Sequence, residues 1–307
     1  MLLSPVILIV YNRPDHTRQT LEALRQNELS EQSDLYIFSD AARSPEQEFN
    51  VAGVRKYIRT VSGFKNIFIH EREHNLGLAK NIISSVSQII SQYGRVILLE
   101  DDLITSPSFL IYMNQALEKY QKVLPVFSVS AYTPRYLEEN ALQEHPYDSY
   151  FNYRNSSWGW GTWEDRWDKV DWQVTDFSQF AGNKHLQKQF NRGGDDLSDM
   201  LIAQQQGKIN SWSIRFTYAH FKHDAVSLCP ARSLIGNIGF DGSGTNCDTD
   251  ILMKNDRKRE FNHKTDFAFP EEVVVNEKIM KSFRWIYERS IYKRITKKIN
   301  RYLLSRQ

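Results

Sequence analysis

The sequence predicts an α/β fold in which a mostly parallel central sheet is flanked by helices. Strand-like and helix-like segments alternate over the first 105 residues, and most of the strand-like segments are short, continuous apolar runs. A strand covered by helices on both faces is apolar at nearly every position, whereas a half-exposed strand alternates between apolar and polar residues. Strands that alternate with helices are typical of parallel sheets built from βαβ units.

Five segments of the first half of the chain are expected to be strands. Each is rich in β-branched or aromatic residues and is bounded by polar or turn-forming residues. The expected strands lie over residues 5–10, 35–38, 66–70, 96–99 and 126–130.

Helices are expected between and after these strands. Apolar residues recur there every three or four positions, which is the spacing of one helix face. The expected helices lie over residues 15–26, 46–61, 75–93 and 108–123.

Length and composition set the broad class. The 307 residues are enough for one large domain or for one domain with an appendage. Hydrophobic residues make up 41% and charged residues 25%, which supplies a substantial core and excludes broad disorder. The net charge of +2 is unevenly distributed, because residues 278–307 carry +9 and the rest carries −7. A mildly acidic body with a basic tail does not suit a general nucleic-acid binder, so no nucleic-acid partner is expected.

The sequence predicts a cytoplasmic protein. Residues 1–10 lack the basic start of a signal peptide, and no window approaches 18 uninterrupted apolar residues. Two cysteines, Cys229 and Cys247, make neither a disulfide framework nor a zinc site and fit a reducing compartment.

The most informative motif is the acidic triplet Glu100-Asp101-Asp102, which ends the apolar run over residues 96–99. A buried strand fixes the position of its own end, and ligands of open α/β sheets bind at the carboxyl edge of the strands. Three adjacent carboxylates repel one another, and a divalent cation between them lowers that cost. The triplet therefore favours a metal and a phosphorylated ligand. The alternative is a solvated acidic turn after a core strand.

Two common phosphate-binding motifs are missing from the sequence. No G-x-G-x-x-G segment and no G-x-x-x-x-G-K-[ST] segment is present. The chain therefore has neither the dinucleotide fingerprint nor the P-loop that those motifs indicate.

A tryptophan-rich segment over residues 156–163 begins the second half of the chain. It contains Trp158, Trp160 and Trp163 with two glycines between them. Indole rings stack on the apolar faces of sugars and donate a hydrogen bond, while glycine lets the backbone approach a ligand. Trp158 and Trp160 are therefore candidate sugar-binding residues. The alternative, a tryptophan-rich corner of the core, is equally compatible with the pattern.

A second glycine-rich segment lies over residues 238–246, with three glycines in six residues. This composition is too loose for a regular element and suits a loop that closes over a ligand. A simple surface turn is the alternative.

Taken together, these motifs resemble a known family. A first strand ending in Asn-Arg-Pro, an Asp after the second strand, an Asn-x-Gly helix start and a strand running into Glu-Asp-Asp are similar to the GT-A glycosyltransferases. More narrowly, ILLEDDLITSPSFLIYM and SVSAY resemble the N-acetylglucosaminyltransferase I group. YRNSSWGWGTWEDRW, NSWSIR and NIGFDGSGTNC resemble bacterial transferases that build surface polysaccharides. The resemblance covers about residues 4–250.

The resemblance implies a role for each matching donor-side residue. Asp102 matches the carboxylate that holds Mn²⁺ or Mg²⁺ against the diphosphate of a nucleotide-sugar, and Asp101 and Glu100 match contacts to the ribose and donor sugar. Asp40 matches the carboxylate that accepts a hydrogen bond from uracil N3–H. The remaining donor-binding candidates are Asn12 and Arg13 beside the base and phosphate, Asn75 and Lys80 in the pocket wall, and Ser243 and Thr245 in the covering loop.

An inverting transferase also needs a base that deprotonates the acceptor hydroxyl. The family's base lies in an acidic pair upstream of a Gly-Lys or Gly-Arg step, matched here by Gly207-Lys208. This spacing favours Asp196, then Asp199, then Asp195. The tryptophan that flanks the family's pair is missing here. The alternative is an acidic first turn that stabilises its own helix through the dipole.

The expected organisation is a catalytic domain over residues 1–270, with a donor half over about 1–135 and an acceptor half over about 136–270. Residues 271–307 are expected to form a basic amphipathic helix. Such a helix can lie on an anionic membrane, on the inner face of the cytoplasmic membrane, or it can pack on the catalytic domain. Its apolar stripe consists of Phe283, Tyr287, Ile291, Ile295, Ile299 and Leu303.

The sequence thus predicts a metal-dependent, inverting hexosyl- or N-acetylhexosaminyltransferase. Its donor would be a UDP-sugar, and its acceptor a glycan or lipid-linked oligosaccharide of a capsule or lipopolysaccharide. Two alternatives stay open: a nucleotidyltransferase acting on a sugar phosphate, and a carbohydrate-binding protein without catalysis. A phosphate loop rich in glycine and basic residues, which the first alternative favours, is missing near the N-terminus. A carbohydrate-binding protein without catalysis would not require Asp102.

Overall fold

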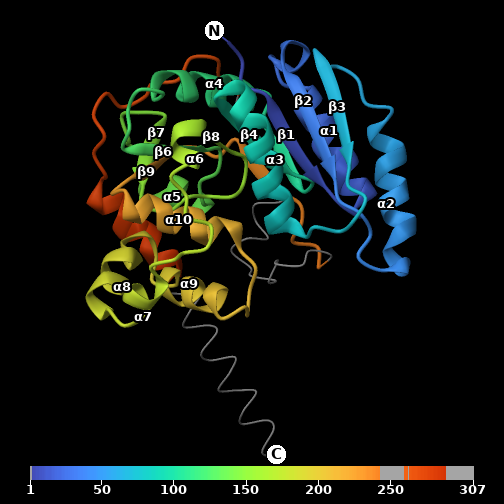
Figure 1. Cartoon of the computed structure of the whole chain (residues 1–307). Coiled ribbons are helices and arrows are strands. Elements are labelled where there is room, and N and C mark those ends of the chain that lie inside the picture. The colour runs from blue at the N-terminus through green and yellow to red at the C-terminus, as the bar shows by residue number, and fades with distance from the viewer. Residues whose placement is uncertain (1, 243–258, 262, 288–307) are drawn as a thin grey trace, which may run out of the picture.

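The computed structural model describes residues 2–242, 259–261 and 263–287. An eight-stranded sheet runs through it with helices on both faces (Figure 1). Its strands are β1 (Val6–Val10), β2 (Asp34–Ser39), β3 (Asn66–Glu71), β4 (Arg95–Glu100), β6 (Val126–Ser130), β7 (Ser149–Asn152), β8 (Trp160–Trp163) and β9 (Val226–Pro230).

The strand order in this sheet is β3-β2-β1-β4-β8-β6-β9-β7. The first four strands are parallel to one another, β8 is antiparallel to both β4 and β6, and β7 is antiparallel to β9. Six of the eight strands therefore run in one direction. This confirms the predicted α/β class with a mostly parallel sheet.

Helices cover both faces of the sheet. One face packs against α1 (Pro14–Arg25), α2 (Pro45–Ile58) and α4 (Phe109–Lys119). The other packs against α3 (Leu78–Tyr93), α6 (Glu164–Trp167) and α10 (Trp212–Lys222). In β1, alternate residues point to the two faces, so Leu8 joins the first core and Ile7 the second. Both faces are buried, which explains the uninterrupted apolar runs of the sequence.

Two smaller clusters complete the second half. The helices α7 (Phe177–Ala181), α8 (Lys184–Phe190) and α9 (Leu197–Gln205) pack with α10 around Phe180 and Phe190. Residues 277–287 are helical and pack against α5 (Arg135–Asn140), β7 and β9. Two short 3₁₀ turns, Ser30–Gln32 and Asn191–Gly193, connect longer elements.

A second, two-stranded sheet holds the acidic triplet in place. It pairs β5 (Leu103–Thr105) antiparallel with β10 (Ile235–Asn237). Because β5 follows the triplet directly, the carboxylates lie in a tight turn between the two sheets. The sequence did not predict this small sheet, because three-residue strands carry little periodicity.

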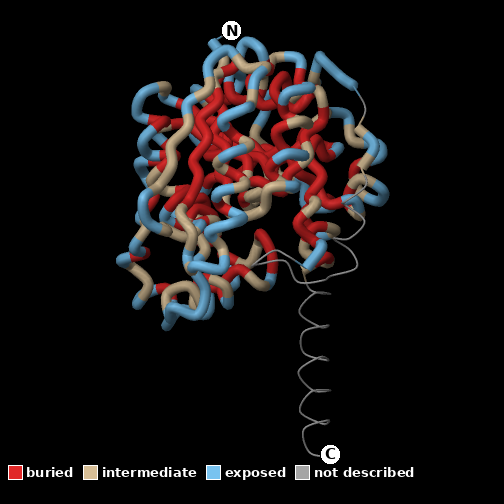
Figure 2. Tube along the Cα trace, turned by 90° about the vertical axis from the view of Figure 1, so that its right-hand side faces the viewer, coloured by how far each residue is buried: buried red, intermediate tan, exposed pale blue. Residues whose placement is uncertain are grey.

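Close packing of β8 against β4 depends on Gly161. A Cβ atom at this position would lie 2.7 Å from the carbonyl oxygen of Val96. Glycine therefore lets the antiparallel strand approach the end of the parallel half of the sheet. The buried residues gather along the sheet, as the red tube in Figure 2 shows.

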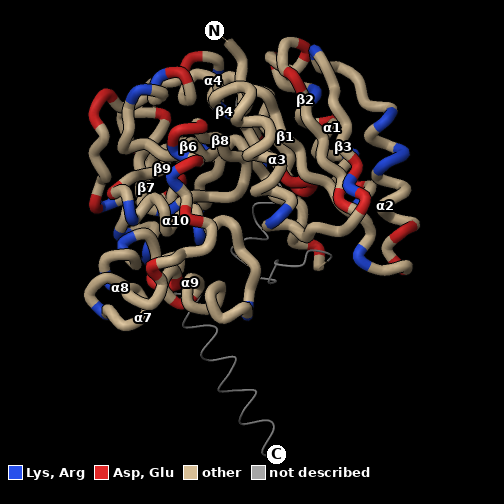
Figure 3. Tube along the Cα trace, viewed as in Figure 1, with Lys and Arg blue, Asp and Glu red and all other residues tan. Residues whose placement is uncertain are grey.

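Charged residues of both signs are interspersed along the described chain (Figure 3). Several of them join separate elements, such as Arg95 of β4 with Glu118 of α4 at 2.8 Å. Among the described residues, no helix has the length and apolar character needed to cross a membrane.

The strands and helices expected over the first 130 residues formed, with differences at helix ends. The helix expected from Asn75 begins at Leu78. The helix expected to end at Val123 stops at Lys119. The first difference has a clear cause, because residues 75–77 form a loop that hydrogen-bonds to Asp40. The helix expected over residues 271–307 begins at residue 277, and its part beyond residue 287 lies outside the described residues.

Candidate active site

The acidic triplet lies at the carboxyl edge of the parallel strands, where β1 and β4 end side by side. Ile9 of β1 pairs with Glu100 of β4. The residues that follow each strand therefore meet, and Arg13 after β1 reaches Asp101 and Asp102 after β4. The sheet thus brings together two segments almost 90 residues apart.

Arg13 is the central cation of this group. One of its guanidinium nitrogens donates to Asp101 Oδ1 and, at 3.0 Å, to Asp102 Oδ2. The backbone N–H of Tyr11 donates to Asp101 Oδ2 at 3.2 Å, and Thr20 Oγ1 donates to the Asp101 carbonyl at 2.9 Å. The loop after β1 and the helix α1 therefore both hold the aspartates of the triplet in place.

Burial and mutual repulsion perturb the titration of this group. Burial raises the pKa of Glu100 to about 8, and the charges of Asp102 and Asp101 add to the rise. Burial also raises the pKa of Asp101, against the opposing effect of Arg13. Burial lowers the pKa of Arg13, but the two carboxylates outweigh it and raise the pKa above its ordinary value. The site holds three carboxyl groups against the single guanidinium of Arg13.

Asp102 is fitted closely against the segment that follows β10. Its carbonyl accepts a hydrogen bond from the backbone N–H of Ile238 at 2.9 Å. A Cβ atom at Gly239 would lie 2.3 Å from Asp102 Oδ2. The space that glycine leaves is therefore required for the observed position of this carboxylate.

Asp40 follows β2 and binds a neighbouring loop. Its two carboxylate oxygens accept hydrogen bonds from the N–H groups of Ala41, Leu76 and Gly77 at 2.9–3.0 Å and from the Asn75 amide at 3.3 Å. A carboxylate offers about four lone-pair sites, so these donors occupy it fully. A hydrogen bond to a uracil base would require these bonds to rearrange.

Three of the other predicted donor residues follow strands of the parallel half of the sheet. Asn12 and Asn75 are partly exposed in the loops after β1 and β3, and Lys80 is exposed on the first turn of α3. Ser243 and Thr245 lie outside the described residues.

The donor set of the triplet suits a hard divalent cation. Carboxylate oxygens are the ligands that Mn²⁺ and Mg²⁺ take, and three carboxyl groups meet here. Among the described residues, no group of three or more His, Cys, Asp or Glu side chains is arranged as a complete metal site. A cation held by Asp102 would therefore need further oxygen ligands from the bound substrate or from water.

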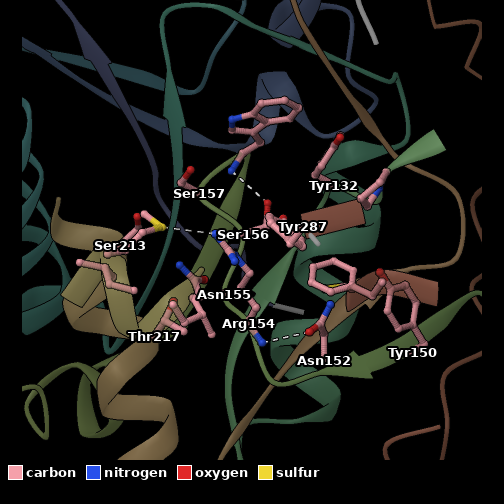
Figure 4. Close-up of a pocket in the computed structure, with 17 residues that line it drawn as sticks. Tyr132, Tyr150, Asn152, Arg154, Asn155, Ser156, Ser157, Ser213, Thr217 and Tyr287 are labelled. Atoms are coloured by element: carbon pink, nitrogen blue, oxygen red, sulfur yellow. Dashed lines mark hydrogen bonds between the residues drawn. The ribbon is translucent and has the colours of Figure 1, made fainter. Parts of the chain in front are cut away.

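A separate cavity of about 200 Å³ opens in the second half of the molecule (Figure 4). It is bounded by the end of β7, the loop before β8, the side of α10 and the helix over residues 277–287. Its lining residues are Tyr132, Pro134, Tyr150, Asn152, Arg154, Asn155, Ser156, Ser157, Trp158, Leu197, Met200, Ser213, Ile214, Thr217, Cys229, Phe283 and Tyr287.

The predicted base Asp196 adjoins this cavity through Arg154. The two guanidinium NH₂ groups of Arg154 donate to the two carboxylate oxygens of Asp196 at 2.7 and 3.0 Å. The Arg154 guanidinium also lies 4.1 Å from the ring centre of Tyr287. Burial lowers the pKa of Arg154, but Asp196 outweighs it and raises the pKa above its ordinary value. Asp199 and Asp195 are exposed near the start of α9.

The two predicted sugar-binding tryptophans have different environments. Trp160 is fully buried, and its ring stacks on Trp212 at 4.7 Å and on Trp167 at 5.8 Å. No face of Trp160 is open to a sugar in this structure, which corrects its assignment as a sugar-binding residue. Trp158 lines the cavity and is partly exposed.

Trp158 also links the cavity to the acidic triplet. Its ring packs edge-on against Phe240 at 5.5 Å, and Phe240 directly follows Gly239, the residue that faces Asp102. The cavity and the carboxylates therefore lie on two sides of one short segment.

Sequence reasoning missed several residues of the cavity. Arg154, Asn155 and Tyr287 stand in motifs that were considered, but nothing in their spacing showed that they meet. The segment YRNSSW did combine a cation, an amide and hydroxyl groups. That density of polar groups before a buried strand was the one feature of the sequence that could have indicated a binding site here.

Comparison with known proteins gives structural similarity only. No protein-family model and no curated protein matches the sequence. The similar solved structures include a mannosyltransferase from Pyrobaculum calidifontis in complex with GDP-Man and Mn²⁺, at 12% identity and a TM-score of 0.39. That match covers 54% of this chain and 46% of the other. The first three structures found are each matched over less than half of their length.

Two further structures match more of the chain. The galactosyltransferase LgtC in complex with donor and acceptor sugar analogues is similar over 83% of this chain and 84% of its own, at 11% identity and a TM-score of 0.35. A putative glucose-1-phosphate thymidylyltransferase from Bacillus anthracis is similar over 85% and 98%, at 7% identity and a TM-score of 0.39. At these values the similarities assign no activity to this chain.

Proposed function

We propose that this protein is a metal-dependent glycosyltransferase that moves a sugar from a nucleoside-diphosphate sugar to a glycan acceptor. One observation carries the proposal. The acidic turn at Glu100, Asp101 and Asp102 lies at the carboxyl edge of parallel strands, and the segment over residues 238–240 contacts both Asp102 and Trp158, which lines a cavity of about 200 Å³. A donor site and an acceptor site joined in this way suit group transfer between two substrates.

The donor half of the proposed site has distinct tasks for its residues. Asp102 holds the cation, with Asp101 and Glu100 directed to the ribose and donor sugar. Arg13 orients the two aspartates and adds positive charge near the diphosphate. Asp40 acts by fixing the loop at Asn75 as one wall of the nucleotide pocket. Asn12, Lys80, Ser243 and Thr245 complete the proposed donor contacts.

A bound Mn²⁺ or Mg²⁺ supplies charge stabilisation for the departing nucleoside diphosphate. The part that this chain contributes is to hold Asp102 in place through Arg13 and Ile238. Gly239 leaves the carboxylate the space that a larger side chain would occupy.

The base step is proposed for Asp196, with Asp199 as second candidate. The acceptor oxygen forms a bond to the anomeric carbon while the bond from that carbon to the diphosphate breaks, with inversion. The departing diphosphate takes the electron pair, and the acceptor proton passes to the carboxylate. Arg154 uses two of about four lone-pair sites of Asp196, so the others can accept that proton.

The finer parts of the proposal concern substrate and place. The donor is proposed to be a UDP-sugar carrying a hexose or N-acetylhexosamine, and the acceptor a capsule- or lipopolysaccharide-type glycan. Trp158 offers an indole face to that acceptor. The protein would act in the cytoplasm, with the chain beyond residue 287 contacting the anionic inner face of the membrane.

Thermal-shift measurements with nucleoside diphosphates and Mn²⁺ test the proposal. A ligand that binds the native state raises the melting temperature, by an amount that grows with its concentration relative to Kd. We expect UDP or a UDP-sugar to raise the melting temperature only when Mn²⁺ or Mg²⁺ is present. If no nucleoside diphosphate shifts it under either condition, the proposed function is wrong.

Product analysis separates the proposal from its alternatives. A glycosyltransferase releases a nucleoside diphosphate, whereas a nucleotidyltransferase releases pyrophosphate from a nucleoside triphosphate. A carbohydrate-binding protein releases neither. Chromatography of the nucleotide products after incubation with UDP-sugars, or with nucleoside triphosphates and sugar phosphates, distinguishes the three.

A further inference from the structure

The cavity beside Trp158 is lined by many polar residues but by very few charged ones. Among the described residues that line it, only Arg154 carries a charge, and Asp196 neutralises it through both carboxylate oxygens. The side chains of Arg154 and Asp196 are 15% and 14% exposed. No uncompensated cation is therefore available among the lining residues to bind a phosphate or a carboxylate.

The remaining polar lining consists of hydroxyl and amide groups. Ser156, Ser213 and Thr217 present hydroxyls, and Asn152 and Asn155 present amides. Figure 4 shows Ser213 and Thr217 on α10 opposite Arg154 and Tyr287. Neutral groups that both donate and accept hydrogen bonds match the hydroxyls of a sugar.

A buried hydrogen-bond chain behind the cavity determines what Asn155 offers. His220 is fully buried, and its Nδ1 lies 2.8 Å from the carbonyl oxygen of Phe216. A carbonyl only accepts, so Nδ1 carries the hydrogen. Burial lowers the pKa of His220 to about 4, so the ring is neutral and Nε2 is an acceptor.

This tautomer fixes the next hydrogen bond. Nε2 of His220 lies 2.8 Å from Ser128 Oγ, so the single hydroxyl hydrogen of Ser128 is donated to the ring. Ser227 Oγ lies 2.8 Å from Ser128 Oγ and donates to it. Ser128 then has one lone pair left and no hydrogen to give.

The Asn155 amide must therefore donate to Ser128. Asn155 Oδ1 lies 3.3 Å from Ser128 Oγ, while its Nδ2 is buried and has no hydrogen-bond partner in the described part of the chain. Because Ser128 donates its hydrogen to His220, Ser128 Oγ and Asn155 Oδ1 would face each other with no hydrogen between them. A rotation of the Asn155 amide by 180° lets Nδ2 donate to Ser128 and leaves the carbonyl oxygen of Asn155 without a partner among the described residues.

Aromatic rings supply the apolar part of the cavity. Trp158 and Tyr132 pack against each other at 4.2 Å, and Tyr287 and Phe283 extend from the C-terminal helix. Rings beside hydroxyl and amide groups match the alternating apolar faces and hydroxyl edges of a sugar. A volume of about 200 Å³ has room for several water molecules and so for a single sugar residue.

We propose that this cavity binds one uncharged sugar residue of the acceptor and disfavours uronic acids and phosphorylated sugars. The carbonyl oxygen of Asn155 accepts a hydrogen bond from a sugar hydroxyl, and the Arg154–Asp196 pair keeps the net charge of the lining at zero. This inference rests on the proposed function, because it names the class of acceptor for that transfer. An anionic group would enter the site without a counter-charge, at the cost of its desolvation.

The test uses the full chain and a panel of oligosaccharides that differ only in their terminal residue. The three terminal residues compared are a neutral hexose, the corresponding uronic acid and the corresponding hexose phosphate. Saturation-transfer NMR measures binding without turnover. We expect the neutral member to bind at least tenfold more tightly than either anionic member. Equal or tighter binding of an anionic member would overturn the proposal.

A charge variant provides an independent readout. Asp196→Asn leaves Arg154 without its counter-charge, so the preference should shift at least tenfold towards the uronic-acid glycan. Asp168→Asn, at an exposed site, is the matched control and should keep the wild-type preference. An unchanged preference in a folded Asp196→Asn variant contradicts the assigned role of the ion pair. If that variant does not fold, the wild-type panel still decides the proposal.

The outcomes distinguish this inference from the proposed function. If UDP with Mn²⁺ raises the melting temperature but no member of the panel binds, the cavity assignment is wrong and the donor assignment stands. If no nucleoside diphosphate binds but neutral glycans do, the cavity binds sugars and the transferase proposal fails.

Discussion

Arg13 joins the carboxylates of Asp101 and Asp102 through one guanidinium nitrogen and is itself only 19% exposed. The cluster has three carboxyl groups against one guanidinium, and burial, together with the charges of Asp102 and Asp101, raises the pKa of Glu100. A bound cation would reduce that imbalance without displacing the backbone hydrogen bonds that hold the turn. We therefore expect the replacement of a single side chain at this site to reduce activity while the protein remains folded.

Replacing Asp102 tests the metal role directly. We expect Asp102→Ala to lower Mn²⁺-dependent turnover by at least about 100-fold, the scale on which one electrostatic stabiliser acts. The control Asp168→Ala removes an exposed carboxylate and should keep full activity. Steady-state kinetics with Mn²⁺ titration measures both. Wild-type turnover in Asp102→Ala would refute the metal assignment.

Gly239 offers a second test, because a methyl group there collides with the Asp102 carboxylate. The 2.3 Å approach to Oδ2 forces that side chain to move. Gly239→Ala should weaken Mn²⁺ binding by about 10- to 100-fold, as changes around a ligand commonly do. Gly182→Ala is the control, since its Cβ would meet only a 3.8 Å contact. Electron paramagnetic resonance of bound Mn²⁺ reports the affinity, and equal affinities in both variants would contradict the prediction.

At the level of elements, the helix over residues 277–287 belongs to the packed body of the protein. Ile279, Met280, Phe283 and Ile286 are buried against α5, β7 and β9. Of the two alternatives for the basic segment, packing on the domain describes these residues. Phe283 and Tyr287 also line the cavity, so this helix connects the C-terminal segment to the proposed acceptor site. The remainder of the apolar stripe lies outside the described residues.

Replacing Met280 tests how much the packing of this helix contributes to the free energy of unfolding. Its side chain is fully buried, so Met280→Ala should lower the free energy of unfolding by about 2–5 kcal/mol. Val274→Ala, where 64% of the residue is exposed, should change it by less than about 0.5 kcal/mol. Urea unfolding compares the two. Similar midpoints for both variants would mean that the helix does not pack as described.

For the whole molecule, the sheet sets the positions of both proposed sites. Its parallel half ends at the acidic triplet, and its mixed half, through β7 and the loop before β8, bounds the cavity. The buried chain of His220, Ser128 and Ser227 joins α10 to β6 and β9 behind that cavity. A neutral histidine in this position links global stability to pH.

Acid should destabilise the fold through His220. Its pKa is lowered to about 4 in the folded protein, so between pH 4 and 6.5 the unfolded chain binds more protons than the native state. The stability contribution is complete above pH 6.5 and is lost as the pH falls towards 4, by about 3 kcal/mol.

Unfolding curves measured between pH 4 and 7 test this sign. His220→Gln, which cannot gain a charge, should show a smaller loss of stability over this range than the wild type. The control His185→Gln changes an exposed ring on α8 and should retain the wild-type slope. Identical slopes for wild type and His220→Gln would contradict the proposed neutral state.

The elements were more predictable than the site. The strands over residues 5–10 and 126–130 were expected from apolar runs alone, because burial on both faces leaves a clear signal. The meeting of Arg13 with Asp101 was not foreseen from spacing, since strand order and register decide it. Trp160 illustrates the same limit, because one segment placed Trp158 at the cavity and Trp160 in the core.

By itself the sequence determined the α/β class, the alternation of elements and an acidic turn at the end of a buried strand. These features follow from local periodicity and composition, which each segment carries independently. Only the tertiary structure decided that Asp40 binds the loop over residues 75–77, that Arg154 neutralises Asp196 and that Tyr287 reaches the cavity. Such contacts join residues far apart in the chain, and side-chain packing fixes them only after the sheet has brought their elements together.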